Sequence, residues 1–310
     1  MHLLAVQPGQ VLDGEEAVDL GQSPGDIVVL SAADSDLACL SQALSGLPDD
    51  FPAVRLANLL RLKHPLSVDL YVEAVVDKAR IVIARLVGGR AYWPYGLDEI
   101  AAACRRRGAL FVALLDEQAD GEGRVVSVAP NAVCDRIFAY LRQGGIANAR
   151  NLLLYAAELI GKARGDWSEP APLLDAGFYW PGQRLTDLDS LVRTWSPERP
   201  KAALVFYRAL VAAGTTQAVD AHVAALVARG FDVAPIFVQS LKNGFAAALI
   251  IETFARIAPD VVLNATAFAV SNPGDDRRPS PLEACDAPVL QLVFAGLDRT
   301  AWEASARGLG

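Results

Sequence analysis

After Pro200 the chain alternates short apolar runs with longer stretches in which apolar residues recur at helical spacing. The apolar runs cover residues 202–207, 232–237, 260–265 and 289–293, and the helical stretches cover 216–229 and 244–257. Parallel strands need a long crossover connection, usually a helix, and such crossovers are almost always right-handed. The alternation therefore predicts a doubly wound parallel sheet over the last third of the chain.

The first part of the chain has the same order of strands and helices. Apolar runs at residues 2–6, 26–33, 53–59, 79–87 and 110–115 predict strands, and helical spacing at 34–45, 65–76 and 97–106 predicts helices between them. The run at 110–115 is apolar throughout, as in a strand that is buried on both faces. The fold class that we expect is therefore α/β, with two Rossmann-like parallel-sheet domains.

A helical segment and a connector separate the two predicted domains. From Asn131 to residue 160 the apolar spacing is helical, with Asn131 as the expected N-cap and Gly144-Gly145 dividing two helices. The stretch 162–200 is rich in Pro, Gly, Asp and Trp and predicts an irregular connector. We therefore expect an N-terminal α/β domain at 1–130, the helical segment and connector at 131–199, and at 200–310 a doubly wound α/β domain that continues beyond residue 310.

Composition argues against several kinds of partner. The 310 residues have a net charge of −8, which would repel a phosphate backbone, so nucleic acid is not an expected partner. The longest apolar runs are far shorter than the roughly 20 residues that span a bilayer, so we expect no membrane span. The start of the chain lacks the basic segment of a secretory signal, and the four cysteines (Cys39, Cys104, Cys134 and Cys285) form no CxxC pair. These features predict a cytoplasmic protein with reduced core cysteines.

Motifs for cofactor chemistry are missing from the sequence. It contains no GxGxxG or GxxxxGK(S/T) loop for phosphates, no GxSxG nucleophile motif and no HExxH metal motif. Only three histidines are present, at positions 2, 64 and 222. We therefore expect this piece of chain to bind no cofactor and to contain no catalytic or metal-ligating residue.

The first candidate site is the segment LKHPLSVDLY, which follows a predicted strand. His64 stands directly before Pro65, and Ser67 and Asp69 follow within five residues. Ligands of open α/β sheets bind at the carboxyl edge of the strands, where this turn is expected to lie. In the alternative interpretation, Ser67 and Asp69 cap or flank the helix and His64 is a solvated turn residue.

The second candidate site is RLVGGRAYWPYG, where a predicted strand ends in Gly88 and Gly89. Two glycines allow a backbone to approach a ligand closely, and the rings of Tyr92 and Tyr95 suit a flat macrocycle. In the alternative interpretation this is a rigid surface loop whose aromatic residues pack on the sheet.

The third candidate site consists of polar residues that follow the strands of the last third. These residues are Arg208, Ser240, Lys242, Asn264 and Thr266. Each can be explained alone as a helix cap or a turn residue. Together they favour a binding edge, because the carboxyl ends of parallel strands meet at one edge of a sheet.

Longer strings of the sequence resemble a known family. They are HPLSVDLYVE, RLVGGRAYWPYGLDE, GFYWPG, ALVFYRALVAAGTTQAVDAHVAALVARGFDVAPIFVQSLK and PDVVLNATAFAV. In this order they resemble the amino-terminal part of the large subunit of aerobic cobaltochelatase, the CobN type, which is related to the H subunit of magnesium chelatase. The resemblance runs along nearly the whole chain, and the combination of strings is specific to the family.

The resemblance implies a very long subunit that acts in cobalamin biosynthesis. Such a subunit binds hydrogenobyrinic acid a,c-diamide, a tetrapyrrole, and receives Co²⁺. Two partner subunits, an AAA+ motor and its adaptor, hydrolyse ATP-Mg. The family's metal-handling residues are expected beyond Gly310, so the resemblance assigns none of them to this chain.

Our hypothesis is that an edge with His64, Tyr92, Arg208, Lys242 and Asn264 faces the macrocycle or the rest of the subunit. Arg208 and Lys242 would then pair with the acetate and propionate groups of the ligand. Three alternatives stay open: a magnesium-chelatase H-type subunit acting on protoporphyrin IX, a module that only docks the AAA+ partners, and a periplasmic-type receptor with two α/β lobes.

Overall fold

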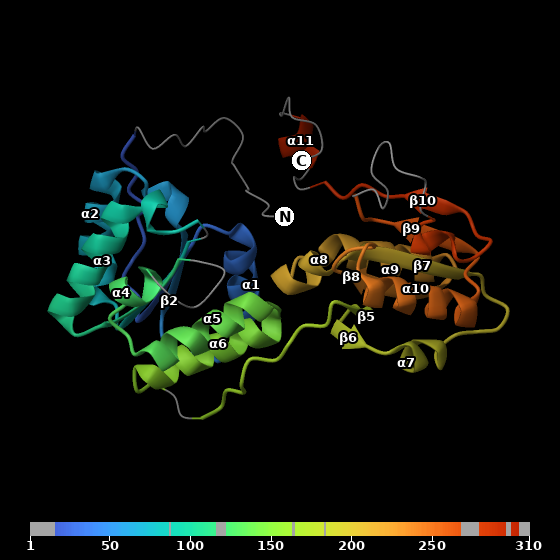
Figure 1. Ribbon diagram of the computed structural model, residues 1–310, viewed down its shortest axis with the longest axis horizontal. Coiled ribbons are helices and arrows are strands. Elements are labelled where there is room, and N and C mark those ends of the chain that lie inside the picture. The colour runs from blue at the N-terminus through green and yellow to red at the C-terminus, as the bar shows by residue number, and fades with distance from the viewer. Residues whose placement is uncertain are drawn as a thin grey trace. The chain divides into compact units, whose positions relative to one another are not determined.

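The computed structural model of the chain describes residues 16–86, 88–115, 122–162, 165–182, 184–267, 279–295 and 299–303. The chain divides into two compact units, Met1–Pro172 and Leu173–Gly310, called unit 1 and unit 2 below. Figure 1 labels their helices and strands. Each unit has one sheet with helices packed on it, so the expected α/β class is confirmed. The strand expected at residues 2–6 lies outside the described residues.

Within the described residues of unit 1, sheet A has four parallel strands in the order β2-β1-β3-β4. The strands are β1 (Ile27–Ser31), β2 (Val54–Asn58), β3 (Ile81–Arg85) and β4 (Leu110–Leu114). Successive strand residues alternate between two apolar cores, because side chains of a strand point to opposite faces. The chain winds from β1 outwards to β2 and then returns to β3 on the other side of β1. The carboxyl ends of β1 and β3 therefore form the switch point of the sheet.

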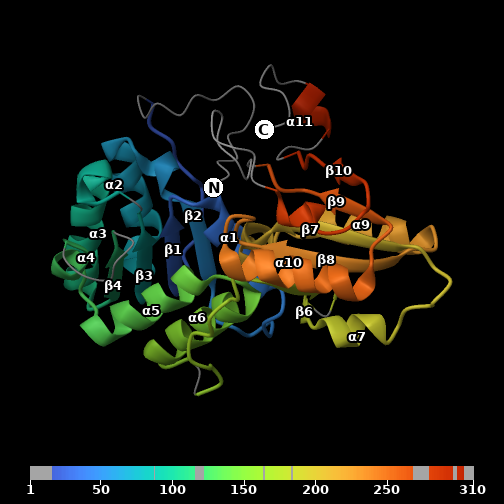
Figure 2. The ribbon, with the colours of Figure 1, turned by 45° about the vertical axis from the view of Figure 1, so that its right-hand side comes forward.

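Helices cover both faces of sheet A (Figure 2). One face packs against α2 (Pro65–Ala74), α3 (Pro94–Arg107) and α4 (Glu122–Val126). The other face packs against α1 (Asp34–Leu44), α5 (Asn131–Gln143) and α6 (Ile146–Leu159). Single 3₁₀ turns, η1 (Leu59–Leu62), η2 (Val76–Lys78) and η3 (Arg90–Tyr92), link the longer elements.

The predicted pair of helices around residues 131–160 is confirmed, with Gly144-Gly145 between them. The prediction that Asn131 caps the first helix is wrong. Pro130 holds the N-cap position, without a side-chain cap, and Asn131 is the first helical residue. Both helices bury apolar residues against sheet A, so this helical segment belongs to unit 1.

In the described part of unit 2, sheet B has six strands in the order β10-β9-β7-β8-β5-β6. The strands are β5 (Ala176–Trp180), β6 (Arg184–Thr186), β7 (Lys201–Tyr207), β8 (Asp232–Val238), β9 (Val261–Asn264) and β10 (Val289–Gln291). The strands predicted after Pro200 are parallel, as expected. β5 pairs antiparallel with both β6 and β8, so two strands from the segment before Pro200 make sheet B mixed.

The segment expected to be irregular supplies these two antiparallel strands and the helix α7 (Leu188–Val192). Gly177 fits within β5 because its missing side chain leaves room for a ring of the neighbouring strand. A Cβ atom at Gly177 would lie 2.8 Å from Cζ of Phe237. Glycine usually weakens a strand, but at this position it is needed so that the Phe237 ring can pack against the backbone of β5.

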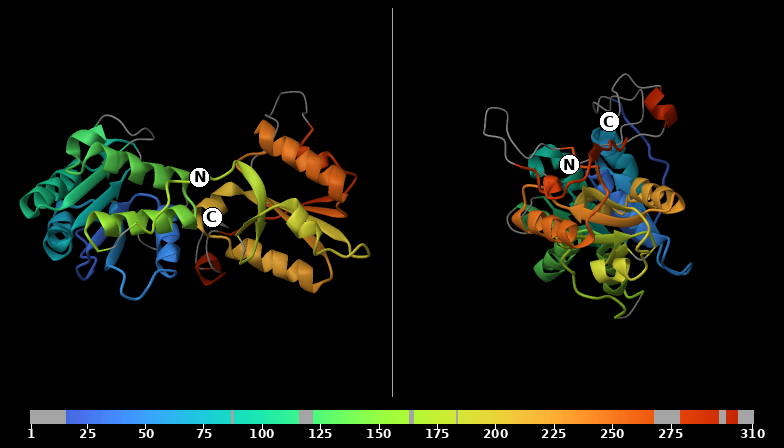
Figure 3. Two further views of the ribbon diagram at one scale, coloured as in Figure 1. Left: turned by 90° about the horizontal axis from the view of Figure 1, so that it is seen from below. Right: turned by 90° about the vertical axis from the view of Figure 1, so that its right-hand side faces the viewer.

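Helices also cover both faces of sheet B, as the left view of Figure 3 shows. α10 (Gly244–Ile257) and α7 pack on one face, and α8 (Arg208–Ala213) and α9 (Gln217–Ala228) pack on the other. The short elements η4 (Pro281–Glu283) and α11 (Arg299–Glu303) complete the described part of unit 2. Within the described ranges, none of the helices has the length and apolar character needed to cross a membrane.

Candidate functional site

The turn after β2 positions the first group of candidate residues at the carboxyl edge of sheet A. His64 is the N-cap of α2, and its Nδ1 accepts a hydrogen bond of 3.2 Å from the Leu66 amide. Ser67 is buried, and its Oγ accepts a hydrogen bond of 2.7 Å from the Val18 amide. His64 therefore caps α2, and Ser67 holds the backbone at Val18 by a buried hydrogen bond. Both residues have structural roles, as the alternative interpretation of this turn proposed in general terms.

The loop after β3 needs both of its glycines for backbone reasons. Gly88 and Gly89 have φ angles of 111° and 85°, which L side chains rarely adopt. A Cβ atom at Gly88 would lie 2.6 Å from Cε2 of Tyr92. The close approach that Gly88 allows is therefore made by the Tyr92 ring of the same loop.

Trp93, a residue that sequence reasoning did not single out, anchors this loop. Its side chain is 4% exposed, and its Nε1 donates a hydrogen bond of 2.7 Å to the carbonyl oxygen of Leu62. Its ring lies against Gly96, where a Cβ atom would be 2.0 Å from Cε2 of the indole. Trp93 thus packs into the core of unit 1, while the neighbouring Tyr92 remains 71% exposed.

A hydrogen bond joins the two candidate groups of unit 1. The hydroxyl of Tyr95 donates to Oδ1 of Asp69 at 2.7 Å, from the first turn of α3 to α2. This hydrogen bond, together with desolvation and the charge of Asp69, raises the pKa of Tyr95 to about 12. Tyr95 is 41% exposed, and Leu66 beside the cap of α2 is 49% exposed. We call this surface, formed by His64, Leu66, Asp69, Tyr92 and Tyr95, the aromatic edge.

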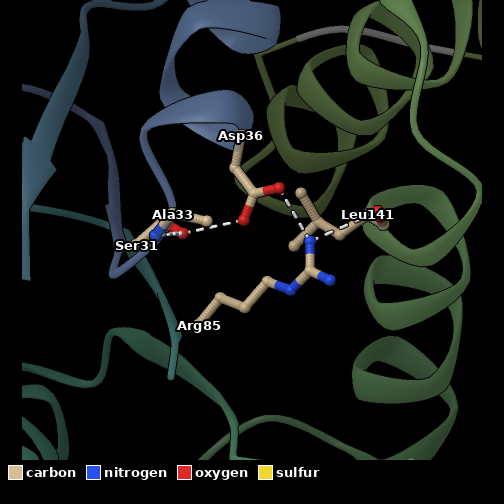
Figure 4. A network of polar contacts seen from close by, with 5 residues as sticks. All are labelled: Ser31, Ala33, Asp36, Arg85 and Leu141. Atoms are coloured by element: carbon tan, nitrogen blue, oxygen red, sulfur yellow. Dashed lines mark hydrogen bonds and ion pairs between the residues drawn. The ribbon is translucent and has the colours of Figure 1, made fainter. Parts of the chain in front are cut away.

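A charged network occupies the switch point of sheet A (Figure 4). Nη1 of Arg85, at the end of β3, donates to Oδ1 of Asp36 at 2.8 Å and to the carbonyl oxygen of Leu141 at 3.3 Å. The other carboxylate oxygen of Asp36 accepts a hydrogen bond of 2.7 Å from Oγ of Ser31, at the end of β1. Oγ of Ser31 in turn accepts from the Ala33 amide at 3.1 Å. This Arg85 network was missed by sequence reasoning, although both strand ends, IVVLS and IVIAR, finish on a polar residue.

A neutral network joins the ends of β9 and β10 at the corresponding edge of sheet B. Oδ1 of Asn264 accepts hydrogen bonds from the Thr266 amide at 3.0 Å and from Thr266 Oγ1 at 2.7 Å. Nδ2 of Asn264 donates to Oε1 of Gln291 at 2.9 Å. Asn264 and Thr266 are buried, so these two candidate residues mainly hold the edge together. Gln291 was not predicted, because its role depends on the pairing of β9 with β10.

The cationic candidates of unit 2 differ in their surroundings. Arg208 donates through Nε to the carbonyl oxygen of Leu174 and through Nη2 to that of Leu173, each at 3.0 Å. Burial lowers the pKa of this guanidinium. Oγ of Ser240 accepts a hydrogen bond of 3.1 Å from the backbone amide of Lys242, and the side chain of Lys242 is exposed. The described residues provide no partner for its ammonium group.

The strand register places all five candidates of unit 2 at one edge of sheet B, as predicted. Tyr207 pairs with Val238, and Asn264 pairs with both Val205 and Gln291, so the carboxyl ends of the parallel strands lie together. The sequence-based hypothesis grouped candidates from both halves of the chain at one edge. In the structure, His64 and Tyr92 belong to unit 1, whereas Arg208, Lys242 and Asn264 belong to unit 2.

The cysteines are free thiols in the structure. Cys39, Cys104 and Cys134 are buried, as expected of core residues, while Cys285 is partly exposed. Desolvation raises the pKa of Cys104 to about 12, which keeps the thiol protonated and unreactive. Over the described residues, no group of three or more His, Cys, Asp or Glu side chains is arranged to hold a metal ion.

These features define an α/β protein of two units whose strand-end edges present aromatic and polar side chains. Residues 138–310 match the family described as CobN/Magnesium Chelatase, and the chain belongs to this family. The family expected from the sequence is thereby confirmed.

Several proteins similar to this chain are named as cobaltochelatase subunits. The chain is 42% identical, over 100% of its length, to aerobic cobaltochelatase subunit CobN of Sinorhizobium sp, and 35% identical to the protein of the same name from Pseudomonas aeruginosa. It spans 25% of the length of each. Among solved structures, the catalytic subunit of cobaltochelatase from Mycobacterium tuberculosis matches with a TM-score of 0.68 at 22% identity, over 92% of this chain and 22% of that chain. This match supports the fold.

Proposed function

We propose that the chain is part of the tetrapyrrole-binding subunit of an ATP-dependent cobaltochelatase. The observation that supports this most strongly is the 42% identity, over 100% of the chain, to a protein named aerobic cobaltochelatase subunit CobN. The names of the two curated relatives favour cobalt over magnesium as the inserted metal. The substrates in this proposal are Co²⁺ and hydrogenobyrinic acid a,c-diamide.

Insertion of Co²⁺ into a tetrapyrrole makes three demands on a protein. The ring must be held, two ring nitrogens must lose protons, and the hydrated metal ion must lose water. We assign the first task to this part of the subunit, because its edges offer surface for a large ligand. The full reaction also needs bases and transient metal ligands, which we place in other parts of the assembly.

The aromatic edge suits one face of a tetrapyrrole. Tyr92, Leu66 and Tyr95 are 71%, 49% and 41% exposed, and flat rings stack favourably on such side chains. The buried indole of Trp93 and the Tyr95–Asp69 hydrogen bond fix the loop before any ligand arrives. A fixed surface loses less conformational entropy on binding, so its contacts contribute more to affinity.

Lys242 is the cation best suited to an acetate or propionate group of the ligand, because its ammonium group is exposed at the edge of sheet B. Arg208 already donates two hydrogen bonds to the carbonyl oxygens of Leu173 and Leu174. We therefore refine its role to that of a positioning residue, which fixes the start of unit 2 against the edge.

The partners in this proposal are an AAA+ motor and an adaptor subunit that hydrolyse ATP-Mg, as in the family that the chain resembles. We also place the protein in the cytoplasm. The three buried thiols of Cys39, Cys104 and Cys134 support that location, since disulfide-free cysteines are typical of a reducing compartment.

An absorbance titration with hydrogenobyrinic acid a,c-diamide tests the binding role in the full-length gene product. The Tyr92→Ala variant should bind about two- to tenfold more weakly, because one aromatic contact contributes roughly 0.5–1.5 kcal/mol. Val227→Ala is the matched control, since Val227 is an exposed apolar residue near the end of α9, at the opposite edge of sheet B. Unchanged affinity of Tyr92→Ala would exclude the aromatic edge, and no binding by the unaltered protein would exclude the function itself.

A further inference from the structure

The edge strand β10 is far more exposed than the other parallel strands of the structure. Every residue of β1 and β8 is buried, and β3, β4, β7 and β9 each have only their end residues partly exposed. β2, the edge strand of sheet A, has four partly buried residues but no exposed one. In β10 all three residues are exposed, with Val289 at 41% and Leu290 at 51%. These two side chains point to opposite faces of the sheet, so both faces of β10 are open to solvent in part. Parallel strands normally have helices on both faces.

Among the described residues, nothing pairs with the backbone groups on the outer side of β10. The carbonyl oxygen of Pro288 accepts from the Val262 amide at 2.9 Å, and the Leu292 amide donates to the carbonyl oxygen of Asn264 at 2.7 Å. Hydrogen bonding alternates along a parallel strand, so Leu290 also faces β9 while Val289 and Gln291 face outwards. Within the part of the chain that the structure describes, the amides of Val289 and Gln291 have no partner.

The sequence at this edge lacks the usual protection against pairing with other chains. Residues 289–295, VLQLVFA, include no charge, and Val293 is a third exposed apolar side chain at 67%. Native proteins protect free edges with charged residues, bulges or a covering element. Uncharged segments with high β propensity otherwise promote aggregation. Because the segment has no charged residue, we expect another element to cover this edge.

We propose that β10 is an internal strand in the complete protein, paired on its outer side with a further parallel strand of the same polypeptide from outside residues 1–310. The curated relatives match the chain over only 25% of their length, so a polypeptide of that size has ample chain for this strand. A parallel neighbour also requires a crossover connection, usually a helix, which would cover Val289 or Leu290. A strand of the same polypeptide would cover the apolar edge permanently, whereas a transient partner protein would expose it each time it dissociates.

Hydrogen–deuterium exchange of the full-length gene product, resolved to single amides by mass spectrometry, tests this pairing. The amides of Leu290, in β10, and of Leu292, directly after it, face β9 and serve as controls. We expect Val289 and Gln291 to exchange as slowly as these controls, at least about a hundredfold more slowly than open amides, at every protein concentration. Fast exchange at Val289 and Gln291 beside slow exchange at Leu290 and Leu292 would overturn the proposal. Slow exchange that needs high protein concentration or an added subunit would also overturn it, because the cover would be another chain.

A pair of variants gives a second readout. Val289→Pro removes the outward amide without affecting the bonds to β9, whereas Val289→Ala shortens the side chain and keeps the amide. The proline variant should have the lower urea midpoint if a strand pairs there. Equal midpoints for the two variants would contradict a paired outer edge.

Discussion

At the carboxyl edges of both sheets, polar side chains form hydrogen bonds within their own unit, but the network of sheet A is charged and that of sheet B is neutral. At the switch point of sheet A a guanidinium and a carboxylate are paired, with side chains of Arg85 and Asp36 that are 22% and 13% exposed. At the edge of sheet B the amides of Asn264 and Gln291 and the hydroxyl of Thr266 form a network without charge. Both edges satisfy their buried polar groups internally.

Comparing the two edges separates residues whose polar groups are occupied by internal hydrogen bonds from exposed residues that a ligand could contact. The strand-end residues that look most functional, Arg85 and Asn264, are occupied by hydrogen bonds within their own units. Exposed side chains that follow the strands, Tyr92 and Lys242, have surface left for binding. In our proposal, stabilisation and ligand binding therefore depend on different residues of each edge.

The largest effect is expected when the anchor of the aromatic edge is removed. Trp93→Ala should lower the free energy of unfolding by about 3–5 kcal/mol, because it deletes a buried indole and leaves the Leu62 carbonyl without its donor. Urea denaturation followed by circular dichroism measures this change. Tyr92→Ala, next in sequence and exposed, should change stability by no more than about 0.5 kcal/mol. Equal effects of the two variants would show that Trp93 is not the anchor.

A smaller effect should separate the charged edge from the neutral one. Asn264→Ala removes the acceptor of the Thr266 amide and hydroxyl and the donor to Oε1 of Gln291, and it should cost about 1–3 kcal/mol at low and high salt alike. Arg85→Ala leaves Asp36 without its guanidinium and should cost a similar amount at low salt. Because about 1 M salt shortens the screening length to about 3 Å, the cost of Arg85→Ala should fall there.

Chemical denaturation by urea, which adds no ions, compares the two variants at both salt concentrations. If Asn264→Ala responds to salt as strongly as Arg85→Ala does, the contrast between a neutral and a charged edge is wrong.

The smallest effect concerns the pKa of Tyr95. Its hydrogen bond to Asp69 favours the neutral phenol, so its contribution to stability is full below pH 10.0 and is lost as the pH rises towards about 12. An ultraviolet difference titration between the unaltered protein and Tyr95→Phe isolates this one tyrosine. In an Asp69→Asn background the same titration should move towards pH 10.0, the ordinary value. A titration that does not move would show that Asp69 does not cause the shift.

The local sequence pattern predicts the parallel strands of both sheets, because an apolar run of five to seven residues between two helices is typical of a buried strand. It fails where an element depends on a distant neighbour. β5 contains Gly177, whose place is set by the Phe237 ring on β8, and no local signal identifies that contact.

The candidate site shows the same limit. The pairing of Arg85 with Asp36 follows from the order β2-β1-β3-β4, which brings the end of β3 beside the start of α1. Tyr92 and Trp93 are adjacent aromatic residues, yet one is exposed and the other is buried. A loop has no periodicity from which a sequence can predict that choice.

Ligand selectivity of the full-length gene product tests the central claim most directly. The protein is titrated separately with hydrogenobyrinic acid a,c-diamide and with protoporphyrin IX, and the absorbance change is followed to saturation. Our account predicts saturable, stoichiometric binding of the corrinoid and much weaker binding of the porphyrin. Preferential binding of protoporphyrin IX, or no saturable change with the corrinoid, would contradict it.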